Sequence, residues 1–369
     1  MPEPKDHQRA LFTRQSRVRG LMLGLALGET LGAARGTVPA GVLRAGVATQ
    51  LACFTAEGVI RAQVRLQHKG ICHAPGVVLH AYSRWAYLQG IAREKMLARW
   101  NPHGTGRWPD GWLADVPALA ERRGSAPATV TALSRIDEGE KAMPTPSRGA
   151  HALTRGLPVA VAGVEGVALV DALAGLTHGD PAARAAAVHA TLLARHCLNH
   201  PAPERTPYTP YAGILTEALE AGLAALPSEA RDLTDDQHDR LTSAVREAAA
   251  RPADRAVLAR LAPDATAPAA LLGGLYAAAS FPRPADLPAA LAFAATASAG
   301  DCVACVTGAL LGAAHGAGLL PAGLVARHEL AWVLDTLARD LVLEFDDSPS
   351  GGEYVRGWDP DWWNRYPGW

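Results

Sequence analysis

The pair Cys302-x-x-Cys305 is the arrangement in this sequence that is most readily tied to chemistry. Two thiols at this spacing can cycle through a disulfide or hold zinc, but the first use needs a strand-to-helix junction and the second needs two more ligands. His196 and His200, four residues apart with Cys197 beside them, are the candidates for those ligands. We favour a core role for the thiols, because the two pairs fall in separate predicted helices and small buried cysteines are common in helical cores. The chain shows no Ser-His-Asp order, nucleotide P-loop or dinucleotide fingerprint.

The stretch GVATQLACFTAEGVIRA (46–62) predicts a buried helix with an unusual entrance. Thr49 is a suitable N-cap, and apolar residues such as Leu51 and Phe54 recur on one face at helical spacing. Glu57 points away from that face, so we expect it to be solvated. The turn before Thr49 carries no acidic or hydroxyl side chain, although a helix N-terminus favours such groups. The entrance therefore offers nothing that can do chemistry.

Helical patterns broken by short Gly/Pro loops recur along the chain, whereas alternating strand patterns are nearly absent. We predict a single all-α domain. Residues 100–150 are rich in Pro, Gly and Arg and predict long loops around one or two short helices; loops of that length are often functional. The predicted helices lie near 17–33, 49–66, 78–96, 167–176, 181–198, 211–226, 235–250, 254–261, 268–279, 286–297, 302–317 and 322–342.

The two ends of the chain differ from the middle in composition. Residues 1–16 are polar and are predicted to be a flexible leader, ahead of a helical domain over 17–345. Residues 346–369 form a tail that contains four tryptophans and two tyrosines. Because so much ring surface would otherwise be exposed, we expect this tail to pack on the domain, or else on a partner or a second copy.

Chain length, net charge and cysteine content limit the classes of protein to which this sequence can belong. The chain has 369 residues and a formal net charge of -1, so no strong field directs it to nucleic acid or to a membrane surface. Five scattered cysteines suit a reducing compartment better than a disulfide framework. No signal peptide and no run of about 18 apolar residues is present. We therefore expect a soluble, cytoplasmic protein.

Four segments, in order, resemble the ADP-ribosylglycohydrolase family, which includes the dinitrogenase reductase-activating glycohydrolases. RVRGLMLGLALGETLGAARG (17–36) is similar to the opening R-x-x-G-x-x-x-G-x-x-x-G-D-x-L-G-A helix, and TQLACFTAEGVIRA (49–62) to a helix that follows Ser/Thr-Asp-Asp-Thr. PSRGAHALTRGLPVAVAG (146–163), with the Leu-Thr-His boundary inside 173–194, resembles the Gly-rich loop region. ATASAGDCVACVTGALLGAAHGAGLLP (295–321) resembles the G-D-x-D-S/T segment. The resemblance covers roughly 17–342 and implies an orthogonal helical bundle of this family's type.

The resemblance also implies where metal ligands would stand, and most of them are missing. Members of the family hold two Mg²⁺ ions through hard oxygen ligands, as that ion demands, in a two-metal arrangement. Residues 37–56 contain neither Asp nor Glu, so no small shift of the alignment restores the acids. One carboxylate cannot hold two hard dications, so no cofactor is expected. The aligned positions hold Gly36, Gly46, Val47, Ala48, Ala299 and Cys302, and only Asp301 keeps its acid.

The ligand-binding side of the resemblance is partly preserved. Of the Gly-rich loop, Ser147, Arg148 and Gly149 remain, while His151 stands where a glycine would let the backbone approach a diphosphate. His178 corresponds to the nucleotide-side histidine. The resemblance thus implies that an ADP-ribose-type ligand would bind through these five residues.

Three hypotheses follow from this combination. The first is a pseudoenzyme without the dinuclear site that acts by binding an ADP-ribose-type ligand or a protein partner. The second is an active hydrolase that cleaves a glycosidic bond by an altered or metal-independent mechanism, with Asp301 as acid or base, helped by Glu29 or His178. Glu29 is alternatively a carboxylate satisfied by loop N–H groups. The third is a structural or oligomerising module that uses the aromatic tail.

Overall fold

The structure is a computed structural model that describes residues 4–136, 143–163, 165–201, 213–230, 233–347, 349–350, 359 and 361–367, with the backbone alone for 4–12. The described residues form helices joined by turns, with isolated bridges but no β-strand among them, as predicted. None of these helices is both long and apolar enough to cross a membrane.

The α-helices are α1 (Pro4–Ala33), α2 (Val47–Lys69), α3 (Ala74–Leu88), α4 (Arg93–Trp100), α5 (Pro117–Ala120), α6 (Pro127–Ser134), α7 (His151–Thr154), α8 (Glu165–Gly175), α9 (Pro181–Asn199), α10 (Gly213–Glu229), α11 (Asp235–Ala250), α12 (Arg255–Leu261), α13 (Ala267–Ser280), α14 (Leu287–Ala294), α15 (Gly300–His315), α16 (Ala322–Val325), α17 (Ala331–Val342) and α18 (Trp362–Arg365). Short 3₁₀ turns cover Trp112–Asp115, Leu157–Ala162, Pro284–Asp286 and Ala317–Leu319, and a π-helical turn covers Leu343–Asp347.

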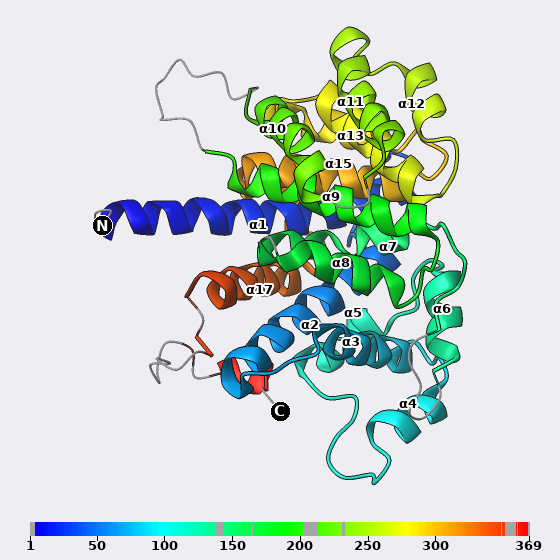
Figure 1. The fold of residues 1–369 in the computed structure, drawn as a ribbon, viewed down its shortest axis with the longest axis vertical. Helices are drawn as coiled ribbons and strands as arrows, with labels where there is room; N and C mark the ends of the chain where they lie inside the picture. The colour runs from blue at the N-terminus through cyan, green and yellow to red at the C-terminus, as the bar shows by residue number, and fades with distance from the viewer. Residues whose placement is uncertain are drawn as a thin grey trace.

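The centre of the bundle is the crossing of α15 with the C-terminal half of α1, which pack against each other over several turns (Figure 1). A Cβ on Gly24 would lie 2.2 Å from the carbonyl oxygen of Gly308, and a Cβ on Gly20 would lie 2.2 Å from that of Gly312. No side chain fits between backbones this close, so the glycines spaced four apart in α1 let the two helices meet. The Gly-x-x-x-Gly pattern of the sequence is thus a helix-crossing surface.

The remaining helices lie on two sides of this crossing. Figure 1 shows α9, α10, α11 and α13 on one side and α2, α3, α4 and α17 on the other. Almost every residue from Val47 to Val64 of α2 is buried, so this helix is surrounded on all faces. A helix that is buried on all sides does not have one apolar and one polar face. Its polar residues must therefore form hydrogen bonds or ion pairs inside the protein.

Several boundaries differ from the predicted ones. The first helix begins at Pro4, so most of the expected leader is helical in the structure. The helix predicted over 78–96 is two helices that separate at Gly90, whose φ of 77° is left-handed. The helix predicted over 322–342 is also divided, because the backbone around His328 pairs with Leu43 of the loop after α1. That pairing ties the 34–46 loop to the rest of the bundle.

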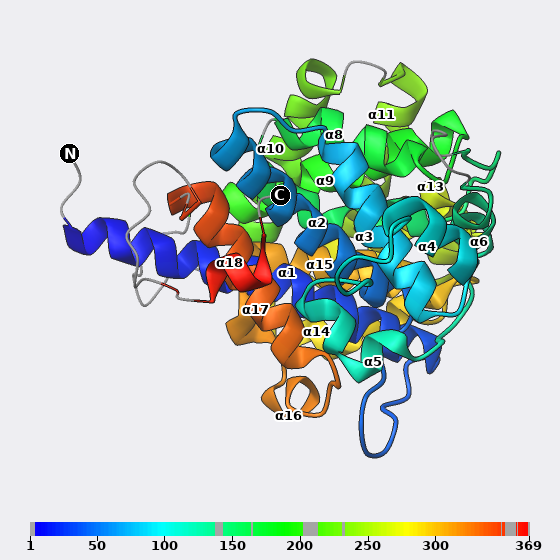
Figure 2. The same ribbon diagram turned by 90° about the horizontal axis from the view of Figure 1, so that it is seen from below.

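The described part of the C-terminal tail packs on the domain. Trp362 and Tyr366 are fully buried, and their rings lie 4.9 Å apart. The hydroxyl of Tyr366 donates to Asp340 of α17 at 2.8 Å, and Arg365 pairs with the same carboxylate at 3.0 Å. Figure 2 shows α18 beside α17. Trp363 is partly buried, with its ring 5.1 Å from that of His68. The remaining aromatic residues of the tail, at 354, 358 and 369, lie outside the described residues.

Candidate functional site

The entrance to α2 is closed by an acid from another helix. The backbone N–H of Ala48 donates to Oε1 of Glu29 at 2.8 Å, and that of Thr49 donates to Oε2 at 2.9 Å. Helix α2 begins at Val47 with Gly46 as its N-cap, so the prediction that Thr49 is the N-cap is wrong. The physical reason is that Glu29 supplies the acceptor that a capping side chain would give, and the helix starts two residues earlier. Both carboxyl oxygens of Glu29 thus accept backbone N–H groups, as the second interpretation of this residue expects.

Gly46 makes room for this carboxylate. A Cβ at residue 46 would lie 2.2 Å from Oε1 of Glu29, which no side chain permits. Burial raises the pKa of Glu29, while hydrogen bonds from Thr49 and Ala48 act in the opposite direction. Both carboxyl oxygens are engaged by the protein itself, so Glu29 is poorly placed to serve as a catalytic acid or base.

At the start of α15, Asp301 stands beside apolar and thiol groups. Its Oδ1 accepts the backbone N–H of Cys302 at 2.8 Å. Cys302 packs in a small buried cluster with Ala150, Ala270 and Ala299. Burial raises the pKa of the Cys302 thiol well above its usual range, and the charges of Asp301 and Glu29 add to this. The thiol therefore stays neutral, which makes it a weak ligand for any hard cation.

The loop before α7 is held by hydrogen bonds within the loop and by contacts with residues 177–180. The N–H of Gly149 donates to Oγ of Ser147 at 3.1 Å, and the backbone of Thr145 pairs with that of His178. Arg148 reaches toward Asp180 at 3.7 Å with its side chain 58% exposed. The loop therefore places the guanidinium of Arg148 at the protein surface.

His178 lies beneath this loop in a defined state. The Thr177 hydroxyl accepts a hydrogen bond from the guanidinium of Arg155 at 2.7 Å and forms a second one with Nδ1 of His178 at 2.7 Å. Burial, with the nearby charges of Arg155 and His151, lowers the pKa of His178 to about 3. The imidazole is therefore neutral, and its other nitrogen is Nε2. That nitrogen faces the loop, 3.5 Å from where a Cβ of Gly149 would stand.

His151 connects the loop to Asp301. Its Nε2 bonds with the carbonyl oxygen of Ser125 at 2.9 Å. Burial lowers the pKa of His151, against the opposing effects of that carbonyl and of the Asp301 charge. The structure thus brings Ser147, Gly149 and His178 together, and it brings Glu29 and His151 within electrostatic reach of Asp301. Gly36 packs elsewhere, where its Cβ would lie 3.1 Å from the carbonyl oxygen of Ala292 on α14.

The histidines considered for zinc have carboxylate partners. His196 bonds with Glu229 at 3.1 Å and His200 with Glu217 at 3.2 Å. Cys305 is fully buried, and burial raises its thiol pKa well above the usual range. Within the described ranges, no three His, Cys, Asp or Glu side chains converge on a point that could hold a metal ion.

The prediction that Glu57 lies on a solvated face is wrong. Its side chain is 0% exposed and pairs with Arg61, one turn away at 3.3 Å, and with Arg84 of α3. Arg61 and Arg84 also reach Asp110, at 2.7 and 3.6 Å. We call Glu57, Arg61, Arg84 and Asp110 the buried ion cluster. Sequence reasoning missed it because its acids and bases come from three separate segments.

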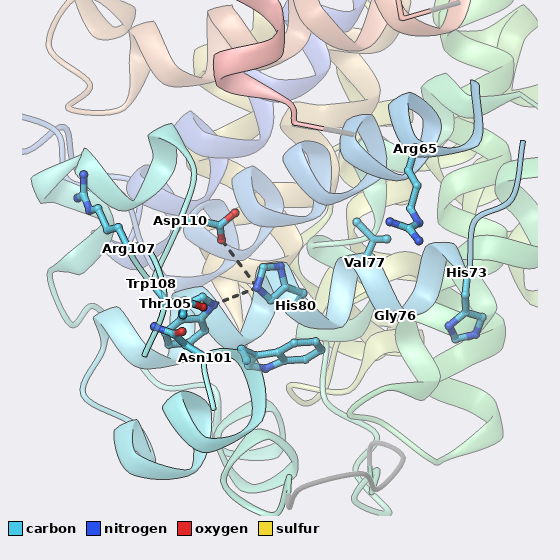
Figure 3. Close-up of a pocket in the computed structure, with 11 residues that line it drawn as sticks. Arg65, His73, Gly76, Val77, His80, Asn101, Thr105, Arg107, Trp108 and Asp110 are labelled. Carbon is cyan, nitrogen blue, oxygen red and sulfur yellow. Dashed lines mark hydrogen bonds and ion pairs between the residues drawn. The ribbon is translucent and has the colours of Figure 1, made fainter. Parts of the chain in front are cut away.

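A pocket of about 530 Å³ opens above this cluster, between α2, α3, α4 and residues 101–110 (Figure 3). His80 stands at its centre, accepting the indole N–H of Trp108 on Nε2 at 3.0 Å and lying 3.7 Å from Asp110. The sequence did contain a signal for it, since the Pro/Gly/Arg-rich loop NPHGTGRWPDGW (101–112) supplies much of its wall. A second pocket, of about 730 Å³ and mostly apolar, lies between α10, α11 and α13.

Fold and site together define an all-α bundle in which α2 and α15 both contact α7, the short helix that begins at His151. The sequence profile of ADP-ribosylglycohydrolases matches residues 12–350, and the chain belongs to this family. A solved structure titled "ADP-ribosylglycohydrolase-related protein complex" is 22% identical to this chain, covers 90% of it and 99% of its own length, and superposes with a TM-score of 0.53. At that identity the likeness supports the fold alone. No curated protein matches the chain.

Proposed function

We propose that this chain is a non-catalytic member of its family. In this proposal the chain lacks a dinuclear magnesium centre and acts by binding an ADP-ribose-type ligand or a protein partner. The observation that carries the proposal is the position of Glu29. Its carboxylate accepts hydrogen bonds from the N–H groups of Ala48 and Thr49, at the turn where the family resemblance places two metal-binding aspartates. A carboxyl group of the protein itself therefore stands at that turn.

The donor set supports the same proposal. Mg²⁺ gives up its waters only to several anionic oxygens in near-octahedral array. At the aligned positions Asp301 is the only carboxylate, Cys302 offers a neutral thiol, and Gly46, Val47 and Ala48 offer no side-chain donor. These residues do not fit a pair of magnesium ions.

The loop residues support ligand binding. Arg148 is a half-exposed cation suited to a phosphate, and the neutral His178 turns Nε2 toward the loop that carries Arg148. Gly149 leaves space between Ser147 and His178, because a Cβ there would approach both side chains. The described tail residues Trp362 and Tyr366 face inward, so the proposal places recognition on this loop.

A second candidate rests on Asp301 and His151. The charge of Asp301 opposes the lowering of the His151 pKa by burial, and the second candidate uses Asp301 as acid or base to cleave a glycosidic bond without metal. Glu29 is a poor helper, since both of its oxygens accept backbone hydrogen bonds.

Calorimetric titration with ADP-ribose, with and without Mg²⁺, tests the proposal. We expect binding that is independent of Mg²⁺, weakened in Arg148→Ala, and unchanged in Arg240→Ala, which removes an arginine from the exposed face of α11. No ADP-ribose should be released from a modified arginine or serine peptide. Mg²⁺-dependent release that is lost in Asp301→Ala would overturn the proposal. Release that persists in chelator and is lost in Asp301→Asn would establish the second candidate instead.

A further inference from the structure

The guanidinium of Arg155 is a buried positive charge that no acid of the described residues balances. Arg155 directly follows α7, which lies against α8 and α9 (Figure 1), and it is 1% exposed. Arg61 and Arg84 are buried to the same degree, but they share the carboxylates of the buried ion cluster. In the part of the chain that the structure describes, no carboxylate pairs with Arg155, and burial lowers its pKa without an opposing acid. Arginine stays protonated in proteins, so this charge is unbalanced.

Neutral groups hold this guanidinium in place. Nη1 donates to Oγ1 of Thr129 at 3.1 Å. Nη2 donates to the carbonyl oxygen of Leu173 at 2.9 Å and to Oγ1 of Thr177 at 2.7 Å. Cζ lies 4.5 Å from the ring centre of Tyr82. These contacts fix the position of the charge without cancelling it, and a fixed charge in a low-dielectric interior acts strongly on the groups beside it.

Thr177 connects Arg155 to His178. The hydroxyl oxygen of Thr177 accepts from Arg155, because a guanidinium can only donate, and it lies 2.7 Å from Nδ1 of His178. Among the described residues this hydroxyl has no third partner. Either the hydroxyl proton points at a bare Nδ1, or Nδ1 carries the hydrogen and the hydroxyl proton has no acceptor. The second arrangement leaves a buried donor unsatisfied, which costs more than one hydrogen bond contributes. The first places the hydrogen of the neutral ring on Nε2.

Nε2 of His178 faces the loop before α7, and it has no hydrogen-bond partner within the described ranges. A Cβ on Gly149 would stand 3.5 Å from Nε2 and 3.2 Å from Oγ of Ser147. The lack of a side chain at residue 149 therefore leaves room beside this nitrogen. If Nε2 carries the hydrogen, a ligand atom that enters this space must be an acceptor.

The charge that acts on His178 is positive. The charges of Arg155 and His151 lower the pKa of His178, and no acid of the described residues raises it. The acids around the loop act on other groups, namely Asp180 and Asp264 on Arg148 and Asp301 on His151. The pairs at the surface are screened by water and salt, whereas the buried charge of Arg155 is screened much less.

We propose that Arg155 is a positioning residue for the ligand of the proposed function, on which this inference rests. Through Thr177 it keeps the hydrogen of His178 on Nε2, and its unbalanced charge favours an anionic oxygen, such as that of a phosphate, at this hydrogen. Arg155 itself is buried and acts through its neighbours.

The state of the His178 ring is measured in the full chain without any ligand, by long-range proton–nitrogen correlation NMR of the protein labelled at histidine. The signals are assigned with His178→Gln. We expect the hydrogen on Nε2, and a mixture of both tautomers in Thr177→Val, in which Nδ1 has lost its donor. The matched control is Thr154→Val, the same change at a buried residue of α7 whose hydroxyl has no partner among the described residues. Hydrogen on Nδ1 in the unmodified chain, or the same tautomer in Thr177→Val as in the control, would refute the relay.

The effect on binding is measured by calorimetric titration with ADP-ribose and with inorganic pyrophosphate, which offers anionic oxygens without the nucleoside. We expect Thr177→Val to weaken both by about 5-fold, the net contribution of one hydrogen bond, and Thr154→Val to leave both unchanged. Arg155→Met, which also removes the charge, should weaken pyrophosphate further than Thr177→Val does. Should Arg155→Met fail to fold, Thr177→Val still decides.

Two outcomes separate this inference from the proposed function. Pyrophosphate that does not bind, or that binds equally to Thr177→Val and Thr154→Val, would overturn the inference even if ADP-ribose binds. Pyrophosphate that binds with the expected losses, together with no binding of ADP-ribose, would support the anion site and overturn ADP-ribose as its ligand.

Discussion

Replacing Glu57 with alanine is the sharpest test of the interior that supports α2 and α3. Glu57 is 0% exposed and meets two guanidiniums whose side chains are 1% and 0% exposed. In Glu57→Ala, Arg61 and Arg84 both lose the buried carboxylate that they share, while Asp110 still contacts each of them. Breaking a buried ion pair from one side costs about 3–5 kcal/mol, and we expect a loss of unfolding free energy in this range.

The assay is equilibrium unfolding in guanidinium chloride, followed by far-ultraviolet circular dichroism. The matched control is Asp236→Ala, which breaks a 3.0 Å pair with Arg240 whose side chains are 70% and 65% exposed. An exposed pair of this kind contributes less than about 1 kcal/mol.

A double variant checks the cause of the loss. In Glu57→Leu with Arg84→Met, one acid and one base leave together, and the 2.7 Å pair between Arg61 and Asp110 stays balanced. We expect the double variant to be more stable than Glu57→Ala. The reasoning is refuted if Glu57→Ala costs no more than the exposed control, or if the double variant is the less stable of the two.

Two further changes test other parts of the fold. Burial raises the pKa of Glu344 from its ordinary 4.5 to about 7, against the hydrogen bond from Ser350, so the folded protein holds this proton more tightly than the unfolded chain. The resulting stabilisation, about 3 kcal/mol, is complete below pH 4.5 and is lost as the pH rises through 7. Glu344→Gln should flatten the pH profile of the unfolding free energy across that window, and identical profiles for the two proteins would contradict this. At the helix crossing, Gly308→Ala places a Cβ 2.1 Å from the carbonyl oxygen of Gly24 and should lower the unfolding free energy by about 1–3 kcal/mol, whereas Gly318→Ala, with no atom within 4 Å, should not, as measured by the same denaturant titration.

The helical class and most helix positions could be predicted because they depend on local patterns. The run RVRGLMLGLALGETLGAARG predicts a helix by its composition, and its glycines spaced four apart meet glycines of α15 at the same spacing. The aligned loop around Gly149 also lies beside His178, as the family resemblance implies. Here short-range sequence and long-range packing agree.

Glu57 and Thr49 show what local patterns miss. The prediction for Glu57 assumed that a helix has one buried face, but α2 is enclosed on every side, and its acid is satisfied by arginines that include one from α3. The prediction for Thr49 assumed that a helix is capped from its own sequence, but the acceptor comes from α1, 20 residues earlier. Both depend on which segments meet in three dimensions, and a single sequence does not contain that information.

The contact between Gly46 and Glu29 constrains the order in which this protein can change. A methyl group at residue 46 would stand 2.2 Å from Oε1 of Glu29, so no other amino acid is accepted there while Glu29 keeps its hydrogen bonds to α2. Any larger residue at position 46 therefore requires the carboxyl group of Glu29 to move away from the start of α2, so a change in this turn is coupled to the side chain of a residue on α1.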